Sequence, residues 1–239
     1  MKITVLGSGN AFNTSGRFHA CYLLESDRFS LILDCGATSL AALQKRKFDL
    51  GEIDFVLLTH FHGDHTFGLP FLLIQMDIIL SRKKELIIHG PPGVEEFCRR
   101  LIETAYPGFL PRFTLSFREI RDVSSIGPWQ VSAFPMTHRP ESSGYRLKDS
   151  SGVFAFSGDC AFDDKLFRLV DGVDLAIVEL SMEKQADPAV AHVALDEVLN
   201  GIENLRAKRT VFSHIYDELS DLAAARGLHT ASDGMVLEI

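Results

Sequence analysis

Four side chains that can bind metal ions fall within one short turn of the chain. His60, His62, Asp64 and His65 directly follow residues 53–58, an apolar run that predicts a buried strand. Neutral imidazole and carboxylate are ligands suited to zinc, iron or manganese. A catalytic zinc ion usually takes three protein ligands plus water, so four donors exceed what one such ion needs. The spacing therefore favours two metal ions that share a bridging ligand over a solvated histidine-rich loop.

Three further donors occupy the same kind of position, just beyond an apolar run. They are His138, Asp159 and His214. Loops at the strand ends of a rigid scaffold often carry function. Taken alone, each histidine is more typical of a surface loop, and Asp159 of a turn or a helix cap. Together with the first motif they give five histidines and two aspartates, which match two metal ions sharing one carboxylate and a bridging water.

The composition is that of an ordinary globular protein. A chain of 239 residues with 46% hydrophobic and 23% charged residues suits one large domain or two fused halves. The net charge of −8, without a long Lys/Arg run, does not indicate a broad nucleic-acid surface. The four cysteines form no Cys-x-x-Cys pair, so we expect small buried residues in a reducing cytoplasm rather than catalytic thiols.

The sequence offers no candidate for a membrane anchor. The longest apolar stretch, residues 68–80, falls short of the roughly 20 residues that a spanning helix needs. The N-terminal apolar run ends at Gly7 and is too short for a signal peptide. We therefore expect a soluble, cytoplasmic protein with no membrane partner.

Strand-rich stretches followed by helices occur in both parts of the chain. Strands are predicted at residues 2–6, 20–25, 30–34, 54–58, 85–89, 113–118, 129–135, 143–147, 152–156, 174–179, 209–213 and 235–239. Helices are predicted at residues 38–47, 66–80, 93–104, 162–170, 192–204 and 217–226. Residues 106–111 predict a loop between the two halves. This order of elements predicts an α/β fold with two sheets packed face to face and helices outside.

From Gly7 to about His214 the chain resembles the metallo-β-lactamase superfamily, on its His-x-His-x-Asp-His motif and the donors that follow in order. The resemblance implies a single domain over residues 1–239, of the α+β type, built as a four-layered αββα sandwich. It also implies that Asp34 supports the residues of the metal-binding turn without binding metal itself. The alternative is that Asp34 caps a helix. The implied ligand sets are His60, His62 and His138 for one metal, and Asp64, His65 and His214 for the other, with Asp159 bridging.

Within the superfamily the chain is most similar to the ribonuclease Z and phosphodiesterase branch, because Gly144-Tyr145-Arg146 follows His138. The branch implies that Glu179 and His192 pass a proton; a strand-end carboxylate and a helix-start histidine are the alternative. Residues 12–17 lack the Pro and Lys of a tRNA-processing member, and the chain has no long Gly- and Lys-rich insertion. Both departures make tRNA a doubtful substrate.

The resemblance thus implies a hydrolase in which two divalent metal ions, zinc before manganese or iron, supply a hydroxide that attacks a phosphodiester. The substrate would be a small molecule or a nucleotide, and Asp64 would orient the hydroxide. Arg17, Arg139 and Arg146 are candidates to hold substrate anions. The alternatives are a carboxylic ester, lactone or thioester hydrolase on the same metals, redox chemistry at iron, and a sensor that binds a phosphorylated ligand. A homodimer is compatible with the resemblance.

Overall fold

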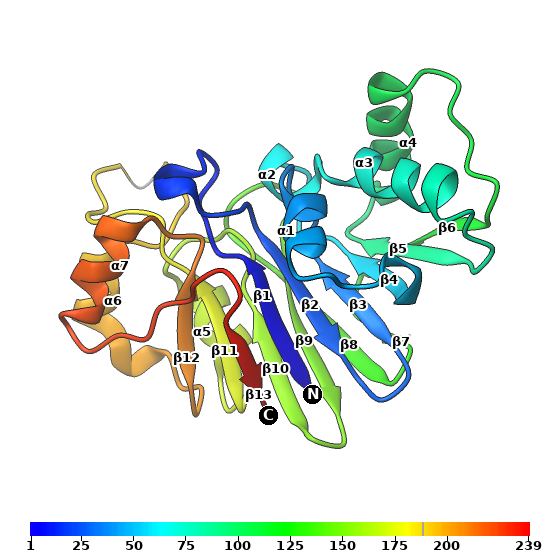
Figure 1. Cartoon of the computed structure of the whole chain (residues 1–239). Helices are drawn as coiled ribbons and strands as arrows, with labels where there is room; N and C mark the ends of the chain where they lie inside the picture. Colours follow the sequence, from blue (N-terminus) through cyan, green and yellow to red (C-terminus); the bar gives the residue numbers. More distant parts are fainter. Residues whose placement is uncertain (188) are drawn as a thin grey trace.

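Two β-sheets form the centre of the molecule, which the computed structural model describes for residues 1–187 and 189–239. Figure 1 shows the two sheets packed face to face, with helices on their outer faces. The first sheet has the order β13 (Val236–Glu238), β1 (Lys2–Gly7), β2 (Cys21–Glu25), β3 (Ser30–Leu33), β4 (Ile53–Leu57), β5 (Leu86–Gly90), β6 (Leu115–Glu119). The second has the order β12 (Thr210–Ser213), β11 (Leu175–Glu179), β10 (Gly152–Phe156), β9 (Ser143–Asp149), β8 (Trp129–Pro135), β7 (Val123–Ile126).

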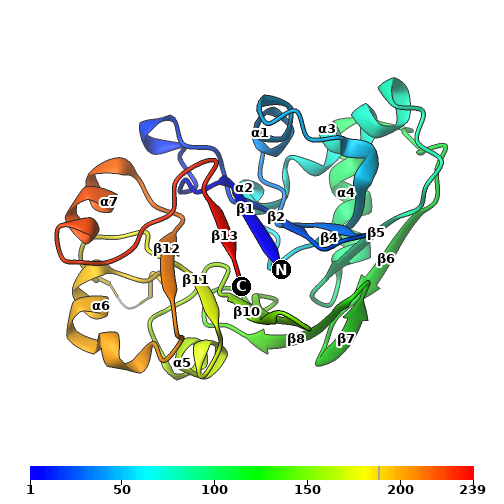
Figure 2. The ribbon, with the colours of Figure 1, turned by 60° about the horizontal axis from the view of Figure 1, so that its bottom comes forward.

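Helices cover the outer face of each sheet, as Figure 2 shows from a second direction. On the first sheet lie α1 (Ser39–Lys45), α2 (Gly63–Thr66), α3 (Leu69–Ile74) and α4 (Val94–Ala105). On the second lie α5 (Asp164–Val170), α6 (Leu195–Gly201) and α7 (Asp217–Ala224). Shorter helical segments are η1 (Thr14–Gly16), η2 (Leu50–Glu52), the π-helical η3 (Gln75–Ile79) and η4 (Ile202–Asn204).

Three hydrophobic clusters fill the three spaces between these layers. The middle cluster joins the facing sides of the two sheets and includes Leu31 and Leu33 of β3, with Trp129 of β8. Ile32, between the two leucines, faces the opposite way and packs in the cluster beneath the first set of helices. Alternate strand residues point to opposite faces, so a nearly continuous apolar strand can be buried on both sides. The expected four-layered αββα sandwich is therefore confirmed.

The boundary between the two halves differs from the prediction. Residues 106–111 do lie between elements, but the strand after them, β6, pairs in parallel with β5 of the first sheet. At the other end of the chain, β13 pairs with β1 of the same sheet. The sheets therefore do not correspond to two consecutive halves of the sequence. Strand pairing depends on contacts between distant residues, which local pattern does not reveal.

Several predicted elements also have different limits. The helix expected at residues 66–80 is divided into the end of α2, then α3 and η3. Gly68 separates α2 from α3, where an added Cβ would lie 2.2 Å from the carbonyl oxygen of Gly36. The helix expected from residue 192 begins only at Leu195, and the short strand β7 was not predicted.

The strand directions explain how the predicted donors meet. Strands β3, β4 and β5 are parallel neighbours in the first sheet, as are β10, β11 and β12 in the second. The carboxyl ends of parallel strands lie at one edge of a sheet, where loops form binding sites. Asp34, the turn from His60 to His65, Asp159 and His214 all follow such ends. No helix in the described part of the chain has the length and hydropathy needed to cross a membrane.

All four cysteines are buried free thiols, as expected for small residues that pack in a core. His89 in β5 is a buried polar residue that stands apart from the predicted donors. Its side chain meets Phe55 edge-on, and neither ring nitrogen has a hydrogen-bond partner among the described residues. Burial, together with Arg118 on the neighbouring strand, lowers the pKa of His89 to about 4. The folded protein therefore holds this imidazole neutral.

This burial makes a specific contribution to acid sensitivity. The unfolded chain binds a proton at His89 near pH 6.5, whereas the folded chain does so only near pH 4, so stability falls as the pH drops between these values. When the pH is lowered from 7 to 5, we expect the free energy of unfolding of wild type to fall by about 2 kcal/mol more than that of His89→Phe. Urea denaturation at the two pH values measures this difference. The matched control is His229→Phe. Equal losses in wild type and His89→Phe would contradict this account.

Candidate metal centre

The turn from His60 to His65 combines an extended segment with one turn of helix. His60 and His62 lie in the extended part after β4, with their ring centroids 4.7 Å apart and at 73° to each other. The helix α2 begins at Gly63 and carries Asp64 and His65. An added Cβ on Gly63 would lie 2.8 Å from the ring of Phe67, so a larger residue there would displace that ring. This local geometry directs the four donors toward the interior between the sheets.

The first of two donor clusters consists of His60, His62, His138 and Asp159, whose ligand atoms all lie within 4.8 Å of one another. Nε2 of His138 is 3.2 Å from Nδ1 of His62. Oδ2 of Asp159 lies 3.8 Å from Nε2 of His60 and 3.9 Å from Nε2 of His138. Three imidazoles and one carboxylate oxygen thus surround one point.

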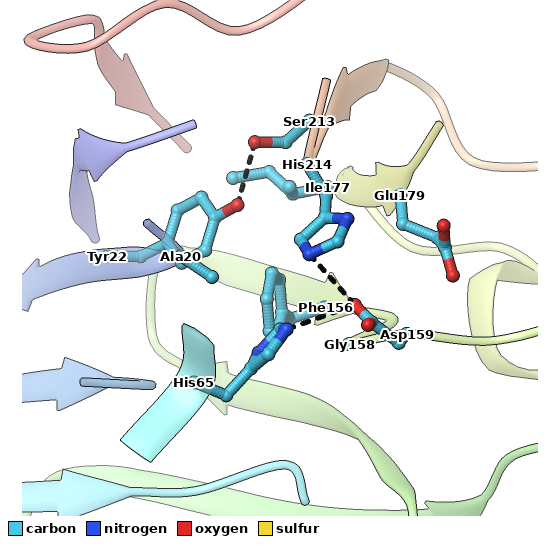
Figure 3. Close-up of a pocket in the computed structure, with 10 residues that line it drawn as sticks. All are labelled: Ala20, Tyr22, His65, Phe156, Gly158, Asp159, Ile177, Glu179, Ser213 and His214. Atoms are coloured by element: carbon cyan, nitrogen blue, oxygen red, sulfur yellow. Dashed lines mark hydrogen bonds and ion pairs between the residues drawn. The ribbon is translucent and has the colours of Figure 1, made fainter. Parts of the chain in front are cut away.

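The second cluster consists of Asp64, His65, Asp159 and His214, within the same limit. Oδ2 of Asp64 is 3.0 Å from Nε2 of His214 and 3.3 Å from Nε2 of His65. Oδ1 of Asp159 lies 3.2 Å from Nε2 of His65 and 3.6 Å from that of His214, as Figure 3 shows. Asp159 therefore turns Oδ1 to this cluster and Oδ2 to the first, which is the arrangement of a bridging carboxylate.

Hydrogen bonds behind the rings fix which nitrogen faces the centre. Nδ1 of His65 contacts Oδ2 of Asp34 at 2.7 Å, and Nδ1 of His138 contacts the carbonyl oxygen of Ala191 at 3.0 Å. Thr59 donates its hydroxyl to Asp34, so its oxygen can accept from Nδ1 of His60 at 3.1 Å. With Nδ1 engaged in this way, each of these three rings turns Nε2 to the centre, where it is the nitrogen available to a metal ion. Asp34 is placed for the supporting role that the resemblance implied.

The charges at the centre favour a bound cation. Burial lowers the pKa of His60 and His62, which keeps their lone pairs free. Burial alone would raise the pKa of Asp64 and Asp159, but the nearby His65 and His214 more than offset it and hold both carboxyls ionised. The buried carboxylate of Asp159 and the largely buried one of Asp64 contact the same rings, so both need positive charge nearby.

Unpaired atoms at the same point support this assignment. Among the described residues, Nε2 of His60, Nε2 of His65 and Oδ1 of Asp159 are buried atoms that lack a hydrogen-bond partner. Such groups are costly unless something coordinates them. The donors present therefore fit divalent metal ions with imidazole and carboxylate ligands.

Glu179 and His192 form a pair beside the first cluster. Nδ1 of His192 lies 2.9 Å from Oε1 of Glu179 and 3.9 Å from Oδ2 of Asp159. Oε1 of Glu179 also accepts the backbone N–H of Cys160 at 2.6 Å. Burial would lower the pKa of His192, but the carboxylate of Glu179 outweighs it and raises the pKa to about 9. At neutral pH the imidazole can therefore hold a proton close to the metal ligands.

The candidate anion-binding arginines are used differently. Arg17 binds Asp217 at 2.6 Å and the Ser8 hydroxyl at 3.0 Å, and Arg146 donates to the carbonyl oxygens of residues 168, 169 and 171. Both therefore hold the fold together. In the described part of the chain, Arg139 forms hydrogen bonds only through its backbone, with Ser142. Sequence reasoning missed Thr59 and Ser181, whose hydroxyls contact the rings of His60 and His214. In the sequence, only their position next to residues already predicted for the site could have indicated them.

The fold and this site define a protein of the metallo-β-lactamase fold, as the resemblance implied. A family model described as "Anti-Pycsar protein Apyc1" matches residues 1–231, and the chain belongs to that family. The anti-Pycsar protein Apyc1 of Saccharibacillus brassicae is 28% identical over 215 residues, which cover 87% of each chain.

Relatives of the ribonuclease Z branch are similar as well. A ribonuclease Z of Haloferax volcanii is 33% identical over 150 residues, which are 62% of this chain and 46% of that protein. The chain thus matches about half the length of that relative. The crystal structure of the short form of human tRNase Z has a TM-score of 0.79 at 25% identity, covering 100% of this chain and 99% of that one. The chain is thus similar to proteins named ribonuclease Z both in sequence and in fold.

The shared position of Asp159 leads to a prediction about metal content. We expect the purified protein to bind two divalent ions, and His62→Ala to keep about one, because His62 belongs to the first cluster only. Asp159→Asn should weaken both sites, because its two oxygens face different clusters. Elemental analysis after equilibration with zinc measures this, with His229→Ala as the control. Loss of the same single ion in both variants would contradict the bridging assignment.

Proposed function

We propose that this protein is a phosphodiesterase with two divalent metal ions, most simply zinc, in which His60, His62 and His138 hold one ion and Asp64, His65 and His214 hold the other. The observation that carries the proposal is the carboxylate of Asp159, with one oxygen toward each cluster. The likeness to ribonuclease Z proteins and to human tRNase Z supports this reaction class.

Bound metal ions would supply a hydroxide at neutral pH and neutralise charge on the phosphoryl oxygens. The chain's own residues would do the rest. Asp64 and Asp159 accept hydrogen bonds from a nucleophile and so orient it. His192 keeps Nδ1 on Glu179, which leaves Nε2 to donate a proton to the departing oxygen. Glu179 stabilises the charged ring and fixes its orientation.

For the substrate we propose a small molecule or a nucleotide with a phosphodiester bond. The chain lacks a Gly- and Lys-rich insertion that could grip tRNA, and its net charge is −8. A long nucleic acid needs many cationic contacts for binding. The buried donors, by contrast, can act on any phosphodiester that reaches them.

The first test combines metal analysis with hydrolysis of bis-nitrophenyl phosphate on one zinc-loaded sample. We expect two ions per chain and turnover, with loss of nearly all activity in His62→Ala at the same zinc concentration, because a metal ligand is removed. Cyclic nucleotides and RNA ends are then compared as substrates. Two ions with hydrolysis of a lactone but of no phosphodiester would replace the proposal by carboxylic ester chemistry. Full activity of His62→Ala would refute the ligand assignment.

The proposed proton donor predicts a dependence on the leaving group. His192→Ala should slow esters of poor leaving groups, such as alkyl alcohols, by about 10²–10⁴-fold, since these need a proton in the transition state. Nitrophenyl esters, which leave readily without one, should be affected far less. Rates on a matched pair of phosphodiesters measure this, with His229→Ala as the control. An equal loss on both esters would remove His192 as the acid.

A further inference from the structure

The hydroxyl of Ser181 lies between the proposed proton-donor pair and one of the candidate metal ligands. Ser181 follows β11 by two residues. Its Oγ is 2.5 Å from Oε2 of Glu179, 2.8 Å from Nδ1 of His214 and 3.3 Å from the carbonyl oxygen of His214. Figure 3 shows the His214 ring between Tyr22 and Glu179, with its other nitrogen toward Asp159. One side chain thus touches parts of the site that come from β11 and from β12.

Counting protons decides the direction of these bonds. A serine hydroxyl has one hydrogen, and the carboxylate of Glu179, which also accepts the N–H of Cys160 and contacts the ring of His192, is its nearest acceptor. Ser181 therefore donates to Glu179, and its oxygen accepts a hydrogen from Nδ1 of His214. This leaves Nε2 of His214, 3.0 Å from Oδ2 of Asp64, as the nitrogen that faces the second cluster.

We infer that Ser181 is a positioning residue that holds His214 in its metal-binding form and connects it to the carboxylate of Glu179. In this arrangement one carboxylate orients two imidazoles, His192 directly and His214 through the serine. Asp34 orients His65 by a direct contact of 2.7 Å, so the serine does for His214 what a carboxylate does for its neighbour.

The backbone at His214 increases the need for this support. His214 has a φ of +58°, in the left-handed region that side chains other than glycine seldom adopt. Such a residue persists only where its surroundings hold it, at a cost of about 1–3 kcal/mol. Leu180 donates its N–H to the carbonyl oxygen of Ser213 at 2.8 Å, which fixes the two strand ends side by side. The Ser181 hydroxyl then sets the ring within that frame.

The inference rests on the proposed metal sites and makes a narrower claim. Groups that orient a metal-binding histidine typically contribute 10–100-fold to metal affinity. Ser181→Ala should therefore weaken the second site, formed with Asp64 and His65, by about that factor. The first site, which does not contain His214, should keep its affinity. Ser181→Thr, which retains the hydroxyl, should restore the second site.

The experiment titrates each variant with cobalt(II) against a competing chelator and follows the visible absorption of both sites. Ser220→Ala is the matched control, because Ser220 lies in α7 and its hydroxyl bonds that of Thr230, at 2.7 Å, and no candidate metal ligand. A nitrogen–proton correlation spectrum of the histidine rings in zinc-loaded protein reports the hydrogen bond made by Nδ1–H of His214. We expect a slowly exchanging Nδ1–H signal in wild type and Ser181→Thr, and a rapidly exchanging one in Ser181→Ala.

The outcomes separate this inference from the proposed function. If wild type binds no metal, the proposed function fails. If wild type binds two ions and Ser181→Ala binds both with unchanged affinity and an unchanged Nδ1–H signal of His214, the role of Ser181 is refuted. Equal weakening of both sites, or the same loss in Ser220→Ala, would show a general loss of structure and would also overturn it. Weakening of the second site alone, with rescue by threonine, supports the inference.

Discussion

The carboxylates of Asp64 and Asp159 approach the same two imidazoles in the interior, and an uncompensated buried carboxylate is among the costliest groups that a protein can hold. The surrounding structure supplies groups that compensate these charges. The donors come from the loop after β4 in the first sheet and from the loops after β8, β10 and β12 in the second sheet, so both sides of the middle core contribute. Asp159 turns one carboxylate oxygen to the rings of each cluster. A charge at this point therefore ties the two sheets together at one edge.

The sandwich keeps this edge rigid enough for buried charges to face one another. The three apolar clusters hold the strand ends in place, and Asp34 and His214 adopt left-handed backbone conformations there, with φ of +56° and +58°. Each such residue costs about 1–3 kcal/mol, which packing elsewhere must offset. Asp34 uses its position to accept from Thr59 and to contact His65. Strain therefore falls on residues that orient the candidate ligands.

The sequence predicted the donors better than it predicted the connections between elements. His60, His138 and His214 each follow a local apolar run, and such a pattern can be recognised without knowing the partners of the strand. The pairing of β6 and β13 with the first sheet depends on residues far away in the chain. Ser181 was overlooked for the same reason, because its role arises only where β11 and β12 lie side by side.

Exposure indicates how a substrate would approach. The side chains of His60 and His65 are 0% and 1% exposed, whereas that of His192 is 23% exposed. The open side of the site is therefore the side of the proposed proton donor, and the closed side is the one that holds the buried charges. When a phosphodiester enters from the open side, the part of it that stays nearer to solvent would lie against His192. That arrangement suits departure of an alcohol toward solvent, while the attacking group remains between the carboxylates of Asp64 and Asp159.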